Sequence, residues 1–208
     1  YIIMKPHYWS KGKSYLSKKD KILKKIIEKH SKDNLFINKN YFESILNSII
    51  GQQISVRAAS SIKEKFFSLE KIIKPEIVLK INLHRLKKIG LSRQKISYIR
   101  NLCIFFLNNK EFIKKINYLN ENDIRKNLIT IKGIGDWTID MFLIFSLGKK
   151  NILPIKDLGL MKAISINYKI NLPINEKKLN FFYKKWEPYN SIATWYLWRS
   201  IDPINVNY

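Results

Sequence analysis

The sequence predicts an all-α protein built from many short helices. Three observations support this fold class: apolar residues recur mainly at helical spacing, two-residue alternation over a strand length is hard to find, and the periodic segments are joined by short connections. With 208 residues, of which 46% are hydrophobic and 13% aromatic, the chain can bury one good core or two small lobes. A disordered chain is therefore excluded.

The helices are predicted in order along the chain. Apolar residues within 22–27 follow helical spacing, with Ser17 or Asp20 as the capping residue, and the segment 41–50 has one apolar face. Residues 86–92 and 128–135 repeat one pattern, a glycine after a helix with a new helix beginning at once. Further helices are predicted at 56–68, 75–80, 83–88, 92–107, 110–117, 121–129, 136–147, 158–168, 176–185 and 188–199.

The chain is strongly basic. Thirty-nine Lys and Arg against sixteen Asp and Glu give a formal charge of +23, which suggests a polyanionic partner, nucleic acid first. Codon bias in an AT-rich genome is the open alternative, since Ile, Lys and Asn are all frequent. A membrane surface fits less well, because the basic residues are spread along the whole chain.

No apolar run approaches the roughly 20 residues that cross a bilayer. The first four residues are too short for a signal peptide; residues 1–3 are either a remnant of an upstream extension or residues added for expression, and Met4 is a candidate start. The sequence thus predicts a soluble cytoplasmic protein, nucleoid-associated if the source is bacterial.

Cysteine and histidine give no sign of a metal site. The single cysteine, Cys103, excludes a disulfide framework and any thiolate cluster, and is expected to be a buried bystander. His7, His30 and His84 show no metal-ligand spacing. We therefore expect no cofactor, with a monovalent or divalent cation at the backbone carbonyls of the predicted hairpin at about 128–147 left open.

Two glycines, Gly133 and Gly135, flank Ile134 between two predicted helices. A helix C-cap accounts for one glycine better than for two. A Gly-Ile-Gly turn leaves backbone N–H groups uncovered beside the N-terminus of the next helix, which together make a site for one backbone phosphate. Ile134 is expected to plug the space between the helices. The helix that follows is apolar nearly all round and should be buried.

Asp157 is the only carboxylate between Asp140 and Glu176. It stands after an extended stretch, 151–156, at the predicted start of a helix. Plain N-capping is the simplest role for it. Capping is compatible with catalysis, because the positive end of the helix dipole favours the ionised carboxylate.

Residues 132–138, followed by Asp157 in the pattern LPxxDxG, resemble the helix-hairpin-helix DNA glycosylase signature, and most closely its 3-methyladenine DNA glycosylase II branch. Residues 42–55 resemble the wedge-loop region of that branch, 90–99 its second glycine turn and 186–193 its final helix. The resemblance covers the chain from about Tyr8 to Arg199 and includes four motifs in the same order.

The resemblance implies two helical lobes with an active-site cleft between them. One lobe, 41–150, carries the helix-hairpin-helix motif at about 128–147; residues 1–40 plus 151–208 form the other. The β-sheet domain that precedes this core in bacterial relatives has no room here, which implies the compact form.

Residue roles follow from the same resemblance. Asp157 falls on the catalytic aspartate, and Gln53 on the side chain that wedges into the gap left by a flipped nucleotide. Trp137 falls where lyase relatives carry a Schiff-base lysine, which implies hydrolysis without strand cleavage. The implied base pocket comprises Trp137, Met141 and Trp198, and the implied DNA-binding residues are Gly133, Ile134, Gly135, Thr138 and Gln53.

One departure concerns the pocket, since a close relative has tyrosine where this chain has Met141. The remaining tryptophans, Trp9, Trp186 and Trp195, are expected in the core. The implied activity is removal of alkylated purines, such as 3-methyladenine and 7-methylguanine, from damaged double-stranded DNA by a monomer. A glycosylase for another damaged base and a non-catalytic helix-hairpin-helix DNA-binding protein remain open alternatives.

Overall fold

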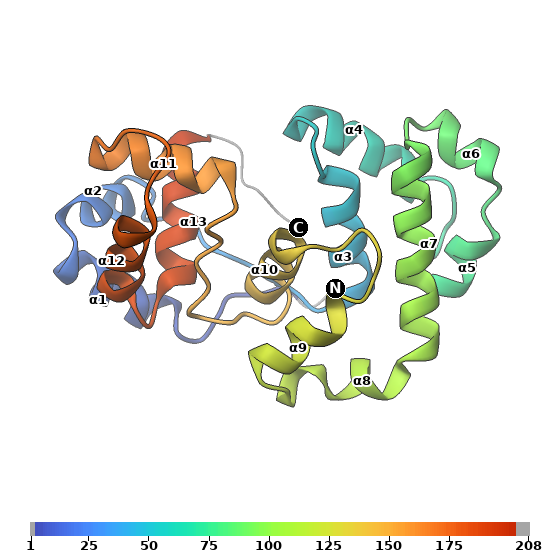
Figure 1. Ribbon diagram of the computed structural model, residues 1–208, viewed down its shortest axis with the longest axis horizontal. Coiled ribbons are helices and arrows are strands. Elements are labelled where there is room, and N and C mark those ends of the chain that lie inside the picture. Colours follow the sequence, from blue (N-terminus) through green and yellow to red (C-terminus); the bar gives the residue numbers. More distant parts are fainter. Residues whose placement is uncertain (1–2, 203–208) are drawn as a thin grey trace. The chain divides into compact units, whose positions relative to one another are not determined.

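The computed structural model describes residues 3–202 (Figure 1). The interpretation of Tyr1 and Ile2 as part of a remnant therefore lies outside the described residues. The last six residues of the predicted second lobe lie outside them as well. The all-α prediction is confirmed, with one short addition: Ile3 and Met4 pair antiparallel with Asn38 and Ile37. None of the described helices is long and apolar enough to span a membrane.

The elements in order are β1 (Ile3–Met4), α1 (Trp9–Lys19), α2 (Lys21–Lys29), β2 (Ile37–Asn38), α3 (Tyr41–Gly51), α4 (Val56–Phe67), α5 (Pro75–Lys80), α6 (Leu83–Lys88), α7 (Arg93–Asn108), α8 (Lys110–Lys115), the 3-10 helix η1 (Ile116–Tyr118), α9 (Glu121–Leu128), α10 (Asp136–Phe145), α11 (Leu158–Tyr168), α12 (Glu176–Trp186) and α13 (Asn190–Ile201).

The described residues form two compact units, which we treat separately. One comprises residues 3–39 with 143–202, and the other comprises Asn40–Phe142. The division therefore falls inside α10, whereas the predicted lobes were 41–150 and 1–40 plus 151–208. The predicted lobe limits and the cleft remain predictions.

In the unit of 3–39 and 143–202, α1, α2 and α11 pack against α13 (Figure 1). The α13 side chains from Asn190 to Trp198 are all buried. Trp9, Trp186 and Trp195 lie in this core, as predicted.

The helix α1 was not predicted, and Ser17 lies inside it instead of capping α2. Its buried positions are Trp9, Gly12 and Leu16. A Cβ added to Gly12 would lie 2.2 Å from Ile192 Cδ1, so the contact of α1 with α13 at this position requires a residue without a side chain. A hydrophobic pattern does not count glycine, which is why periodicity missed this helix.

Asp20 organises the same core. Its Oδ1 accepts from the backbone of α2, and its Oδ2 accepts from Tyr168, from the Trp186 indole at 3.0 Å and from Lys185. Burial by itself would raise the pKa of Asp20, but the hydrogen bonds from Trp186, Lys185 and Tyr168 leave it lowered. A buried carboxylate with this many donors ties three helices together.

In the unit Asn40–Phe142, α3 and α5 pack against the long α7 (Figure 1). Cys103 is fully buried on α7, and burial raises the pKa of its thiol to about 12, as suits the predicted bystander. Asp140 on α10 accepts a hydrogen bond from Arg125 on α9. Burial raises the pKa of Asp140 to about 6, although Arg125 opposes the shift.

Three of the predicted helices differ from the structure in their limits or their form. The helix predicted at 136–147 ends at Phe145, because Gly148 adopts a φ of +61° and the Lys149 N–H bonds back to the Leu143 carbonyl. The helix predicted at 188–199 begins at Asn190, beyond Pro188, and runs to Ile201. The segment 110–117 divides into α8 and η1.

Candidate active site and nucleic-acid interface

The hairpin between α9 and α10 is a tight glycine turn. Gly133 has a φ of +100°, and a Cβ there would lie 2.0 Å from the Tyr98 ring, so both conformation and packing require glycine. Ile134 is 5% exposed and its N–H donates to the Ile131 carbonyl at 2.9 Å. Ile134 is thus buried at the turn, which agrees with a side chain that fills the space between the helices, and that role remains a prediction.

Gly135 differs from Gly133, because the chain itself does not require glycine there. Its φ lies outside the left-handed region, the residue is exposed, and an added Cβ would meet no atom within 4 Å. The surface at Gly135 therefore lets another molecule approach the backbone closely, beside the N-terminus of α10, where backbone N–H groups have no partner within the helix.

Gln52 is a residue that the sequence analysis missed. Its side-chain amide donates to the Gly133 carbonyl at 3.0 Å and to Thr138 Oγ1 at 3.1 Å. Gln52 therefore joins the C-terminal end of α3 to the hairpin. Thr138 is 2% exposed, so its side chain faces inward and a DNA contact by this residue would use its backbone. The paired glutamines 52 and 53 were the sequence signal, but only the second was interpreted.

Gln53 follows directly in an exposed loop between α3 and α4. It has a φ of +58°, which is rare for a residue with a side chain. The loop is anchored on both sides: Lys95 Nζ donates to the Ile50 carbonyl at 2.6 Å, and Ser55 caps α4 through the Ala58 N–H. A strained, exposed residue in an anchored loop suits the wedge role.

Asp157 caps α11. Its Oδ1 accepts from the Leu160 N–H at 2.6 Å and from the Trp198 indole Nε1–H at 2.8 Å. The carboxylate is half-buried. A Cβ added to Gly159 would lie 3.1 Å from Asp157 Oδ1 and 3.6 Å from the Trp198 ring, so glycine leaves room for this contact. Asp157 thus caps α11 and also presents a carboxylate that is held in place and partly accessible.

Trp198 holds Asp157 from α13. Its ring stacks on Phe145 with centroids 5.9 Å apart and an interplanar angle of 14°, and the side chain is 9% exposed. Trp198 was assigned to the base pocket by resemblance; the structure adds a hydrogen bond to the predicted catalytic group. Because the partners are 41 residues apart, no local sequence pattern could have shown this pair.

The predicted site residues fall into the two units. Asp157 and Trp198 lie together in the unit of 3–39 and 143–202, whereas the hairpin, Gln53, Trp137 and Met141 belong to Asn40–Phe142. Trp137 is half-buried and Met141 is 1% exposed. The base pocket therefore remains a prediction. Over residues 3–202, no group of three or more His, Cys, Asp and Glu is placed to hold a metal ion.

A glycine hairpin between two helices, followed by a helix-capping aspartate, defines a helix-hairpin-helix protein. Residues 46–188 match the model of the HhH-GPD superfamily of base excision DNA repair proteins, and the chain belongs to this family.

Similar proteins carry consistent names. The chain is 33% identical over 150 residues to the DNA-3-methyladenine glycosylase of Saccharomyces cerevisiae, covering 67% of this chain and 50% of that protein. It is 30% identical to a DNA-3-methyladenine glycosidase of Bacillus halodurans, whose crystal structure aligns with a TM-score of 0.73 over 96% of this chain and 92% of that chain.

The 3-methyladenine DNA glycosylase of Schizosaccharomyces pombe, solved in complex with abasic DNA, is 23% identical. Its structure aligns with a TM-score of 0.80 over 91% of this chain and 96% of that chain, which supports the fold. The chain spans 66% of a Bacillus subtilis relative to which it is 30% identical over 188 residues.

Proposed function

We propose that this chain is a monofunctional DNA glycosylase that removes alkylated purines, of the 3-methyladenine and 7-methylguanine type, from double-stranded DNA. It hydrolyses the bond between base and sugar and leaves an abasic site. The observation that carries the proposal is the Asp157 carboxylate, which Leu160 and Trp198 hold at the start of α11. The names of the similar glycosylases support the substrate class.

A base inside a duplex cannot reach a carboxylate on the protein, so the nucleotide must be flipped out, at a cost of a few kcal/mol. In this proposal, phosphate contacts at Gly135 and insertion of Gln53 offset that cost. Stacking of the extruded base on an aromatic ring contributes roughly 1–3 kcal/mol. The half-buried Trp137 is the ring proposed for this role.

The chemistry needs only one carboxylate. Alkylation at N3 or N7 gives the purine a positive charge, so the base departs as a neutral molecule with the electrons of the glycosidic bond, and positive charge develops on the sugar. Asp157 stabilises that charge electrostatically, orients the water that adds to the sugar carbon and accepts the proton that this water loses. Paired carboxylates, as in ordinary glycosidases, are unnecessary because the leaving group needs no proton. Cation–π attraction to Trp137 favours the charged base by roughly 0.5–2 kcal/mol.

We further propose hydrolysis without strand cleavage. A lyase needs an amine placed to attack the sugar, and the family position for that lysine is Trp137 in this chain. We propose that a monomer serves one lesion at a time, and that the protein works in the cytoplasm, at the nucleoid if the source is a bacterium, because DNA is the proposed substrate.

The test is incubation of the protein with methylated duplex DNA, chromatography of the released bases, and then alkali treatment of the strand. The expected result is free 3-methyladenine and 7-methylguanine, with strand breaks only after alkali. A duplex containing an oxidised purine serves as the comparison substrate. Release from that duplex alone would replace the alkylated-purine proposal, and breaks before alkali would overturn the hydrolase proposal.

A further inference from the structure

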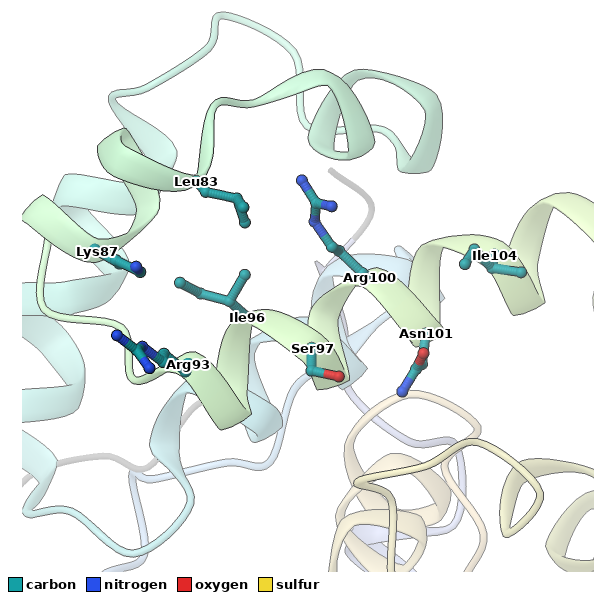
Figure 2. Close-up of a pocket in the computed structure, with 8 residues that line it drawn as sticks. All are labelled: Leu83, Lys87, Arg93, Ile96, Ser97, Arg100, Asn101 and Ile104. Atoms are coloured by element: carbon teal, nitrogen blue, oxygen red, sulfur yellow. The ribbon is translucent and has the colours of Figure 1, made fainter.

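A hollow of about 460 Å³ lies between α6 and α7, within the unit Asn40–Phe142. The side chains of Leu83, Ile96 and Arg100 are directed to the same space, with Lys87 and Arg93 at one end (Figure 2). Ser97, Asn101 and Ile104 complete the lining along α7. The proposed glycosylase chemistry uses none of these residues. The volume of the hollow is enough for a few side chains of a ligand.

The charged part of the lining is entirely basic. Lys87, Arg93 and Arg100 form no ion pair with any carboxylate in residues 3–202. Other arginines are paired, for example Arg85 with Glu70 at 2.8 Å. The Arg100 Nε is buried and has no hydrogen-bond partner within residues 3–202. Because no carboxylate in residues 3–202 pairs with Lys87, Arg93 or Arg100, the hollow favours an anionic ligand that supplies acceptors.

The apolar part of the lining narrows the class of ligand. Leu83 is 45% exposed and Ile104 is 48% exposed, one on each helix, and Ile96, which lies next to Leu83 in Figure 2, is buried. A DNA phosphate would satisfy the cations but would leave these apolar side chains in water. A ligand with carboxylates and apolar side chains matches both the basic and the apolar part of the lining. Arginine binds a carboxylate bidentately, and an apolar side chain of the ligand covers leucine.

We propose that this hollow, the α6–α7 hollow, binds an acidic segment of a partner protein in which carboxylates alternate with large apolar side chains. A carboxylate of that segment accepts from the Arg100 guanidinium, and an apolar side chain packs against Leu83 and Ile96. Because the hollow shares no residue with the proposed catalytic machinery, a partner could bind there during base excision.

The test uses the full chain and a short fluorescein-labelled peptide that alternates aspartate with leucine, followed by fluorescence anisotropy. The matched control peptide has serine in place of leucine and therefore the same charge. The expected result is saturable binding of the leucine peptide, weakened roughly tenfold or more by Arg100→Ala and by Leu83→Gln. Arg57→Ala, which removes an exposed arginine outside the hollow, should leave the peptide affinity unchanged.

Equal affinity for the two peptides, or equal losses from Arg100→Ala and Arg57→Ala, would mean that net charge alone attracts acidic chains, and would overturn the proposal. An unmodified duplex should bind Leu83→Gln as tightly as it binds the parent protein. Loss of duplex binding in Leu83→Gln, with peptide binding kept, would assign the hollow to nucleic acid instead. Base release from methylated DNA should be unchanged in both hollow variants, so failure of the peptide result and failure of the glycosylase proposal are separate outcomes.

Discussion

The hydrogen bond from Trp198 to Asp157 gives the sharpest test of how the site works. The change Trp198→Phe keeps a six-membered aromatic ring against Phe145 and removes the pyrrole part of the indole, with the N–H that donates to Asp157 Oδ1 at 2.8 Å. Asp157 would keep the Leu160 N–H at 2.6 Å, so the carboxylate should stay in the cap but lose the indole donor that helps to fix its orientation. Trp198 acts as a positioning residue in this account.

The magnitude follows from the kind of bond. A hydrogen bond to a charged group contributes about 1.5–3 kcal/mol. If that contribution fixes the reactive orientation, losing it should slow base release by roughly 10- to 100-fold, since each 1.4 kcal/mol is a factor of ten. The assay is single-turnover release of 7-methylguanine from duplex DNA with enzyme in excess, which reports the chemical step. The enzyme concentration at half-maximal rate, which reports binding, should change little.

A matched control exists in the same unit. Trp186 also donates its indole N–H to a carboxylate, that of Asp20 at 3.0 Å, inside the structural core. The change Trp186→Phe should lower the free energy of unfolding by about 1–3 kcal/mol and leave the single-turnover rate of the folded enzyme intact. If Trp198→Phe retains the parental rate, or if both variants lose activity only in proportion to stability, Trp198 does not position Asp157 and the reasoning is refuted.

The hairpin gives a second prediction: Gly135→Ala should unfold like the parent but bind duplex DNA more weakly, whereas Gly133→Ala should destabilise the protein because a Cβ there meets the Tyr98 ring. Thermal unfolding measures the stability and fluorescence anisotropy the DNA affinity. Normal DNA affinity in Gly135→Ala would contradict a close approach of DNA to the backbone at Gly135. Gln52→Ala removes both amide hydrogen bonds to the hairpin and should cost roughly 1–3 kcal/mol of stability and reduce DNA affinity. If chemical denaturation and DNA binding are both unchanged in this variant, the contact between Gln52 and the hairpin is unimportant. The pKa of Asp140 is raised to about 6 in the folded protein, so this carboxyl favours folding most at a pH below its pKa in the unfolded chain, and the contribution is lost as pH rises through 6. The free energy of unfolding of Asp140→Asn, relative to the parent, should therefore grow by up to about 3 kcal/mol between pH 4 and pH 7. A difference between the two proteins that stays constant across that range would refute the shift.

Local patterns in the sequence predicted most of the helices. The turn at Gly133 and the cap at Asp157 are local features, each decided by a few neighbouring residues, so they could be predicted before the structure was known. The helix α1 could not be predicted, because one of its buried positions is Gly12, where an added Cβ would meet Ile192 from the far end of the chain.

The candidate site likewise has features that the sequence predicts and features that only the folded chain shows. The resemblance gave Asp157 its role, but the donors that fix a carboxylate come from distant parts of the chain, as Trp198 does. Gln52 shows a related limit: its amide contacts Gly133, 81 residues away, and no periodicity or spacing rule connects the two. Residues that join distant segments are visible only once the chain is folded.

The most direct test of the central claim is Asp157→Asn, measured for base release and for DNA binding with the same methylated duplex. Asparagine keeps an oxygen that can accept the bonds from Leu160 and Trp198 but carries no negative charge. The account predicts loss of base release with DNA affinity largely kept. Full release of 3-methyladenine and 7-methylguanine by this variant would contradict the claim that the Asp157 charge drives the reaction.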